Sequence, residues 1–160
     1  MFLDALSFLE EEREAWRPFE ALDALTDEEL ERPVEAAHGW SGRDLMSHLV
    51  AWQELALEGA RELAVSETSP ALARTEAEWA ARGDAMNEDL LEAWRRLPIA
   101  EVRRRFRHVP GELRGYLTVV PESRWVKHPR NMETFVADTL EHYQDHLADL
   151  RAILEAAGRG

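Results

Sequence analysis

Two histidines four residues apart stand in the stretch TLEHYQDHLADL, residues 139–150, which otherwise has the pattern of an amphipathic helix. Residues four apart on a helix share a face, with Cβ atoms about 5–6 Å apart, so the imidazoles of His142 and His146 can reach one ion. Two ligands alone bind weakly. His48 is the strongest candidate for a third ligand, because it lies on the buried side of another predicted helix. The pattern indicates a three-histidine metal site.

A second interpretation of these histidines is structural. A lone histidine on an apolar face is usually a core residue that is hydrogen-bonded through its ring nitrogens. The pair is a stronger metal signal, but a chance pair is not rare in a chain with six histidines. A protease of the HxxEH type is disfavoured, because the only downstream glutamate, Glu155, lies about 13 Å further along the same helix. From the residues alone, the metal site and the core interpretation both stay open.

Carboxylates accompany the histidines. Asp138, Asp145 and Asp149 lie close to the histidine side of the last predicted helix, and Asp44 stands four residues before His48. A carboxylate there could accept an imidazole N–H or transfer a proton, although each could equally belong to a solvated acidic face. They are candidate neighbours of the metal ligands.

One basic cluster, RRRFRH at residues 103–108, stands out in an acidic chain. Arg103, Arg104 and Arg107 could guide the carboxylates of a thiol cofactor or an anionic substrate, although such runs often only balance acidic neighbours. Three tryptophans could line a pocket, but aromatic residues at helical spacing are usually core. They are Trp40, Trp52 and Trp125.

The bulk properties exclude several classes of function. The 160 residues, 45% of them hydrophobic, suit a single domain over residues 1–160. A net charge of −13 repels nucleic acid and anionic membranes. There is no cysteine, so a site must use histidine, carboxylates and hydroxyls. We find no signal peptide or membrane span and predict a cytoplasmic protein; few amide side chains and many arginines fit a thermophilic source.

Apolar residues recur at helical spacing almost throughout, which predicts an all-α protein. Ser41 with Asp44, and Thr75 with Glu78, have the pattern of capping boxes. Pro110 and Gly111 should kink the fourth helix. The helices are predicted over residues 2–25, 41–65, 75–97, 99–120 and 132–157, with a short acidic turn after the first.

A weak internal echo relates the two halves at an offset of about 94 residues. DLMSHLVAW at residues 44–52 and DTLEHYQDH at residues 138–146 both read Asp, then His four residues on, then a large ring. We interpret the halves as related helix pairs with pseudo-two-fold symmetry. His48 and His142 would then face each other in a four-helix bundle with additional short helical segments, a fold whose interior assembles cofactor sites.

Three segments together resemble the DinB/YfiT-like superfamily of metal-binding four-helix bundles over nearly the whole chain. They are LTDEELERP, GWSGRDLMSHLVAWQE and HPRNMETFVADTLEHYQDHLADLRAIL. The resemblance implies that His48, His142 and His146 bind a divalent ion with positions open to water or ligand. The chain looks closest to the ClbS/DfsB-type and maleylpyruvate-isomerase-like branches.

The superfamily includes transferases and isomerases that use bacillithiol, mycothiol or glutathione, and a cyclopropane-opening hydrolase. The resemblance therefore implies a metal-dependent enzyme that activates a thiol or water against a small electrophile. A non-catalytic, metal-stabilised sequestering protein, dimeric through an exposed bundle face, is the alternative. Three imidazoles suit zinc, nickel, iron or copper, so the sequence does not name the ion.

Overall fold

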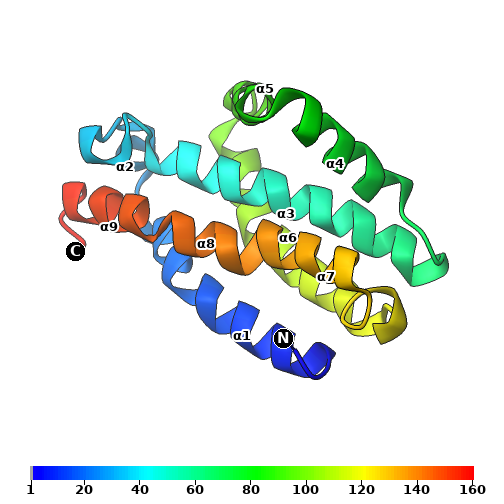
Figure 1. The fold of residues 1–160 in the computed structure, drawn as a ribbon. Coiled ribbons are helices and arrows are strands. Elements are labelled where there is room, and N and C mark those ends of the chain that lie inside the picture. Colours follow the sequence, from blue (N-terminus) through cyan, green and yellow to red (C-terminus); the bar gives the residue numbers. More distant parts are fainter. Residues whose placement is uncertain (1) are drawn as a thin grey trace.

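The computed structural model describes residues 2–160, and those residues form helices and connecting turns without a strand (Figure 1). Long helices lie side by side in a bundle, and a shorter pair covers one side of it. This confirms the predicted all-α bundle. None of the helices in residues 2–160 has the length and apolar character that crossing a membrane requires. The bundle consists of α1 (Ala5–Trp16), α3 (Gly42–Val65), α6 (Ile99–Val119) and a segmented C-terminal helix that begins with α7 (Pro129–Val136).

The central helix, α3, begins at the predicted capping box. Ser41 Oγ accepts a hydrogen bond from the Asp44 N–H at 3.1 Å, and the Asp44 carboxylate accepts one from the Ser41 N–H at 3.1 Å. The helix is buried on most of its circumference, because the bundle covers one side and the shorter pair covers the other. A Cβ added at Gly59 would meet Leu72 Cδ2 at 2.4 Å, so a larger residue at this position would force Leu72 of the covering pair to move.

The N-terminal helix is shorter than the predicted span of residues 2–25. It ends at Trp16 and continues as a 3-10 turn over Arg17–Ala24. Pro18 lacks the N–H that an α-helix would donate to Glu14, which favours the change. The tighter period of three then places Phe19, Leu22 and Leu25 on one buried side. The acidic turn that follows is α2 (Asp27–Glu31).

The predicted helix over residues 75–97 is wrong in its start and its continuity. The structure has two helices there, α4 (Pro70–Arg82) and α5 (Asp84–Arg95), and Thr75 lies inside the first rather than capping it. Ser69 is the actual N-cap, and Glu62 of α3 accepts hydrogen bonds from its hydroxyl at 2.6 Å and from the Ala71 N–H at 2.8 Å. Gly83, at φ 53°, interrupts the helical conformation between α4 and α5.

The C-terminal helix was predicted as one span, residues 132–157, but it is segmented. After α7 comes a π-helical turn, Ala137–Glu141, followed by α8 (His142–Asp145) and α9 (Leu147–Ala156). His146 lies between the last two, at φ −108° and ψ 8°. The predicted fourth helix is confirmed as α6, which continues through Pro110 from Ile99 to Val119.

Candidate metal centre and pocket

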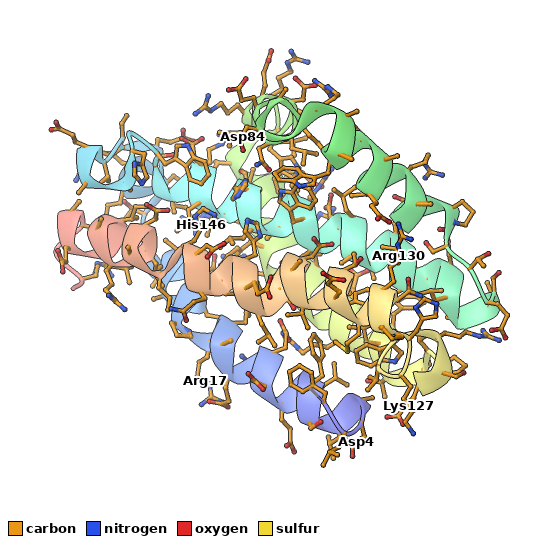
Figure 2. The ribbon with its side chains drawn as sticks, viewed as in Figure 1. Asp4, Arg17, Asp84, Lys127, Arg130 and His146 are labelled. Atoms are coloured by element: carbon orange, nitrogen blue, oxygen red, sulfur yellow. The ribbon has the colours of Figure 1, made fainter. Side chains whose placement is uncertain are left out.

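Three histidine side chains meet between α3 and the C-terminal helix, and Figure 2 shows His146 between these two ribbons. The His48 Nε2 and His142 Nε2 atoms are 2.8 Å apart. The three ring centroids are separated by 4.6, 4.8 and 4.9 Å. One ring nitrogen from each residue lies within 4.8 Å of the other two. The structure therefore brings together the three residues that the sequence singled out.

The spacing of these nitrogens fits a divalent ion. Zinc–nitrogen bonds of about 2.0–2.1 Å in a tetrahedral site place two ligand atoms about 3.3 Å apart. The His48–His142 separation of 2.8 Å is shorter than that value, and none of the separations in the cluster exceeds 4.8 Å. Small rotations of the rings would equalise them. The donor set of three imidazoles suits a transition metal.

Burial keeps two of the histidines neutral. Burial, with a smaller contribution from His146, lowers the pKa of His48 to about 3. Burial also lowers the pKa of His142 to about 2, with His48 and His146 adding to the effect. Neutral imidazole is the form that binds a metal, so these ligands need not lose a proton at neutral pH.

Asp149 orients the third histidine. Its Oδ2 lies 2.8 Å from His146 Nδ1 and accepts that N–H, which leaves Nε2 to face the cluster. Trp40 stacks on the His146 ring at 5.6 Å and 17° and meets His48 edge-on at 4.9 Å. Since Trp40 directly precedes the N-cap Ser41, the start of α3 positions this ring.

Asp138 lies in the π-helical turn and is buried, with 8% of its surface exposed. Its Oδ2 has no hydrogen-bond partner among residues 2–160, and neither does His142 Nδ1. Burial raises the pKa of Asp138 to about 8, so its carboxyl is mostly protonated at neutral pH. It is the only one of the four candidate carboxylates that combines burial with an unsatisfied oxygen in the described residues.

Acid should destabilise the metal-free protein. His48 and His142 take up protons in the unfolded chain below about pH 6.5, but their lowered pKa values keep them neutral in the folded chain. Asp138 opposes this, because its raised pKa favours the folded state as pH falls. We expect a net loss of about 2 kcal/mol from these three groups between pH 6.5 and 4.5, and Asp138→Asn should add roughly as much again. Urea unfolding at several pH values, with chelator present, measures the free energy of unfolding of the wild type and of Asp138→Asn. If both proteins lost the same free energy between pH 6.5 and 4.5, the expectation would be contradicted.

Other predicted residues lie elsewhere. Asp44 caps α3 and accepts hydrogen bonds from Arg95 Nε at 3.0 Å and from a second Arg95 nitrogen at 3.2 Å, so its contacts are those of a helix cap. Asp145 is exposed at the edge of the pocket described below. The structure does not bring the basic cluster to the site. Its arginines pair with acidic groups, Arg103 with Asp23 and Asp27, Arg107 with Asp23, and Arg104 with Glu101.

A pocket of about 790 Å³ opens beside the histidines, between the covering pair α4–α5 and the segments α7 and α8. Trp52 forms part of its wall, and its Nε1 donates a hydrogen bond to Asn87 Oδ1 at 2.8 Å. Trp79 meets Trp52 edge-on at 5.6 Å. Sequence reasoning missed Trp79 and Asn87, because the predicted single helix gave no reason to fold α4 and α5 over α3. Trp125 is a core residue.

A buried polar network on the opposite side of α8 was also missed. Tyr143 donates its hydroxyl hydrogen to Glu12 Oε1 at 2.8 Å and accepts a hydrogen bond from Gln53 Nε2 at 2.8 Å. Arg114 donates to Glu12 Oε2 at 3.0 Å. Burial, with the charge of Glu12, raises the pKa of Tyr143 well above its ordinary value, so the phenol remains a donor. The network joins α1, α3, α6 and α8 and fixes the rotation of the helix that carries His142.

The chain was compared with known protein families. A family model described as the mycothiol maleylpyruvate isomerase N-terminal domain matches residues 9–146, which include all three histidines. No curated protein and no solved structure matches the chain.

Proposed function

The chain belongs to the mycothiol maleylpyruvate isomerase N-terminal domain family, and we propose that it is a metal-dependent enzyme acting on a small electrophile. This family lies within the DinB/YfiT-like superfamily. His48, His142 and His146 would hold a divalent transition metal, and the nucleophile would be a low-molecular-weight thiol or water. The observation that carries the proposal is the convergence of three imidazoles at the wall of a pocket large enough for a small molecule.

Three neutral protein ligands suit a catalytic ion better than a structural one, because they leave it a full positive charge and an exchangeable position. When bound, such an ion lowers the pKa of a water or thiol that coordinates it. The chain has no cysteine, so a thiol nucleophile must come from a co-substrate. The mycothiol in the family's description makes a thiol of that class the first to test.

The remaining residues prepare the site. Asp149 fixes the tautomer of His146, and Trp40 limits the rotation of the His146 and His48 rings. The tryptophan pair of α3 and α4 shields one side of the pocket from water. Asp138 would exchange a hydrogen bond or a proton with a ligand in the pocket; its place in the lining and its unpartnered oxygen in the described residues support this role.

Metal content tests the proposal. Purified protein reloaded with zinc, nickel or iron should retain close to one ion per chain after gel filtration, and the triple variant His48→Ala/His142→Ala/His146→Ala should retain none. His108→Ala is the matched control, since His108 is exposed on α6. Elemental analysis gives the count. Equal metal in the wild type and the triple variant would remove the proposal.

Turnover separates an enzyme from a sequestering protein. The metal-loaded protein should accelerate reactions of small electrophiles with mycothiol, bacillithiol or glutathione, or their hydrolysis, and the triple variant should not. Tight metal binding without any turnover would instead favour the non-catalytic alternative.

A further inference from the structure

The pocket beside the histidines has an uneven distribution of charge. Glu133, Glu141 and Asp145 line it from α7, the π-helical turn and α8, and none of them has an ion-pair partner among residues 2–160. Arg130 is the one cationic side chain that the described residues contribute to the lining, and it is already paired with Glu76 of α4. Figure 2 shows Arg130 on the side of α7 that faces α4. The pocket therefore offers carboxylates and no free cation.

An unsatisfied buried group gives a second and independent indication of a ligand. Asp138 lines the same pocket, is 8% exposed, and has an oxygen that no donor in the described residues satisfies. Leaving a buried polar atom unpaired costs free energy, so such groups in native proteins usually meet water or a ligand. Asp138 stands four residues after Thr134 and four before His142, and all three residues line the pocket.

The opposite wall carries aromatic and apolar side chains beside the polar Thr75, Glu76 and Asn87. Trp52, Trp79 and Leu72 lie there, and Trp79 is 44% exposed. An exposed indole beside a cavity favours a flat or apolar group, and it also attracts a cation to its face. A ligand that fits both walls has an apolar body and a hydrogen-bond-donating, positively charged end.

We propose that this pocket selects a substrate that carries a protonated amine on an apolar or aromatic body, and that Asp138 accepts a hydrogen bond from that amine. The inference rests on the proposed function, because it names the substrate class of the same site. It also predicts that a small dicarboxylate is a poor substrate. The carboxylates of Glu133, Glu141 and Asp145, here called the rim carboxylates, would repel a dianion, and no unpaired arginine among the described lining residues would compensate.

Binding of three matched probes tests the proposal. The zinc-loaded protein is titrated with 2-phenylethylamine, 2-phenylethanol and 3-phenylpropionate at low ionic strength, with tryptophan fluorescence or calorimetry as the readout. The amine should bind roughly tenfold or more tighter than the carboxylate, and added salt should reduce the difference. Equal or tighter binding of 3-phenylpropionate would overturn the proposal.

Substitutions test which side chains cause the preference for the amine. Asp138→Asn and the double variant Glu133→Gln/Asp145→Asn should each weaken amine binding several-fold to tenfold while leaving 2-phenylethanol unchanged. Glu88→Gln removes an exposed carboxylate of α5 that does not line the pocket and should have no effect. If Asp138→Asn weakens metal retention but not amine binding, the carboxyl serves His142 instead, and its assignment as the amine acceptor is wrong.

The triple histidine variant keeps this test separate from the metal proposal. The rim carboxylates and Asp138 remain in that variant, so it should still prefer the amine over the carboxylate. If the wild type bound no metal but still preferred the amine, the proposed function would be wrong and the inference about the pocket would remain supported. If the wild type retained metal but showed no preference for the amine, the inference about the pocket would be wrong and the proposed function would stand.

Discussion

Replacing Glu12 with alanine is expected to lower the free energy of unfolding by about 3 kcal/mol or more. The carboxylate is 1% exposed and serves two partners, the Tyr143 hydroxyl and the Arg114 guanidinium. Breaking a buried ion pair from one side typically costs about 3–5 kcal/mol, because the other charge stays without a partner. Arg114 is partly exposed and can turn to water, which places the effect at the lower end of that range.

Urea or guanidinium unfolding in the presence of chelator measures this effect without a metal contribution. Glu11→Ala is the matched control, since Glu11 is the exposed neighbour on α1, and its change should stay within about 0.5 kcal/mol. Tyr143→Phe should cost about 1–2 kcal/mol, because Glu12 keeps Arg114. A Glu12→Ala variant as stable as Glu11→Ala would show that the network contributes nothing to stability.

Replacing Asp149 with alanine is expected to weaken metal binding by about 10–100-fold. Carboxylates that accept the second N–H of a ligating histidine fix its tautomer and raise its basicity, and their loss costs this much in affinity. The Asp149 Oδ2 to His146 Nδ1 distance of 2.8 Å places it in that position. Competition with a chromophoric chelator at fixed pH gives the dissociation constants.

Asp145→Ala is the natural comparison for Asp149→Ala. Asp145 stands four residues earlier, at the end of α8, whereas Asp149 lies in α9. Asp145 is exposed and forms no hydrogen bond to a histidine among the described residues. Its removal takes away the same charge, and we expect less than a threefold change in metal affinity. If both substitutions weakened binding equally, the effect would be one of net charge and not of the imidazole hydrogen bond.

Much of the fold could be predicted because its signals are local. The Ser41–Asp44 capping box and the helical period set α3 correctly. The errors arose where partners distant in sequence decide the outcome. The N-terminus of α4 depends on Glu62 of α3 as well as on Ser69 and Pro70, and Thr75 shows that the same cap pattern can occur inside a helix.

The three histidines could be predicted to meet, since two share a helical face and the third lies on a buried one. Their surroundings could not. Asp44 and Asp138 both stand four residues before a histidine, yet Asp44 lies in regular helix and pairs with Arg95, while Asp138 lies in the π-helical turn. Sequence spacing does not distinguish these two geometries, because both satisfy the same local pattern.

The π-helical turn at Ala137–Glu141 sets the rotation of the helical segments that follow it about the helix axis. An α-helix advances about 100° per residue. One extra residue therefore rotates all later side chains by roughly that angle about the helix axis. Deleting one residue there would carry His142 and His146 together out of alignment with His48 while their mutual spacing stayed intact. A relative that kept the HxxxH pair but lost the insertion would then have an identical motif pointing in a different direction, so length between Phe135 and His142 matters as much as the motif itself.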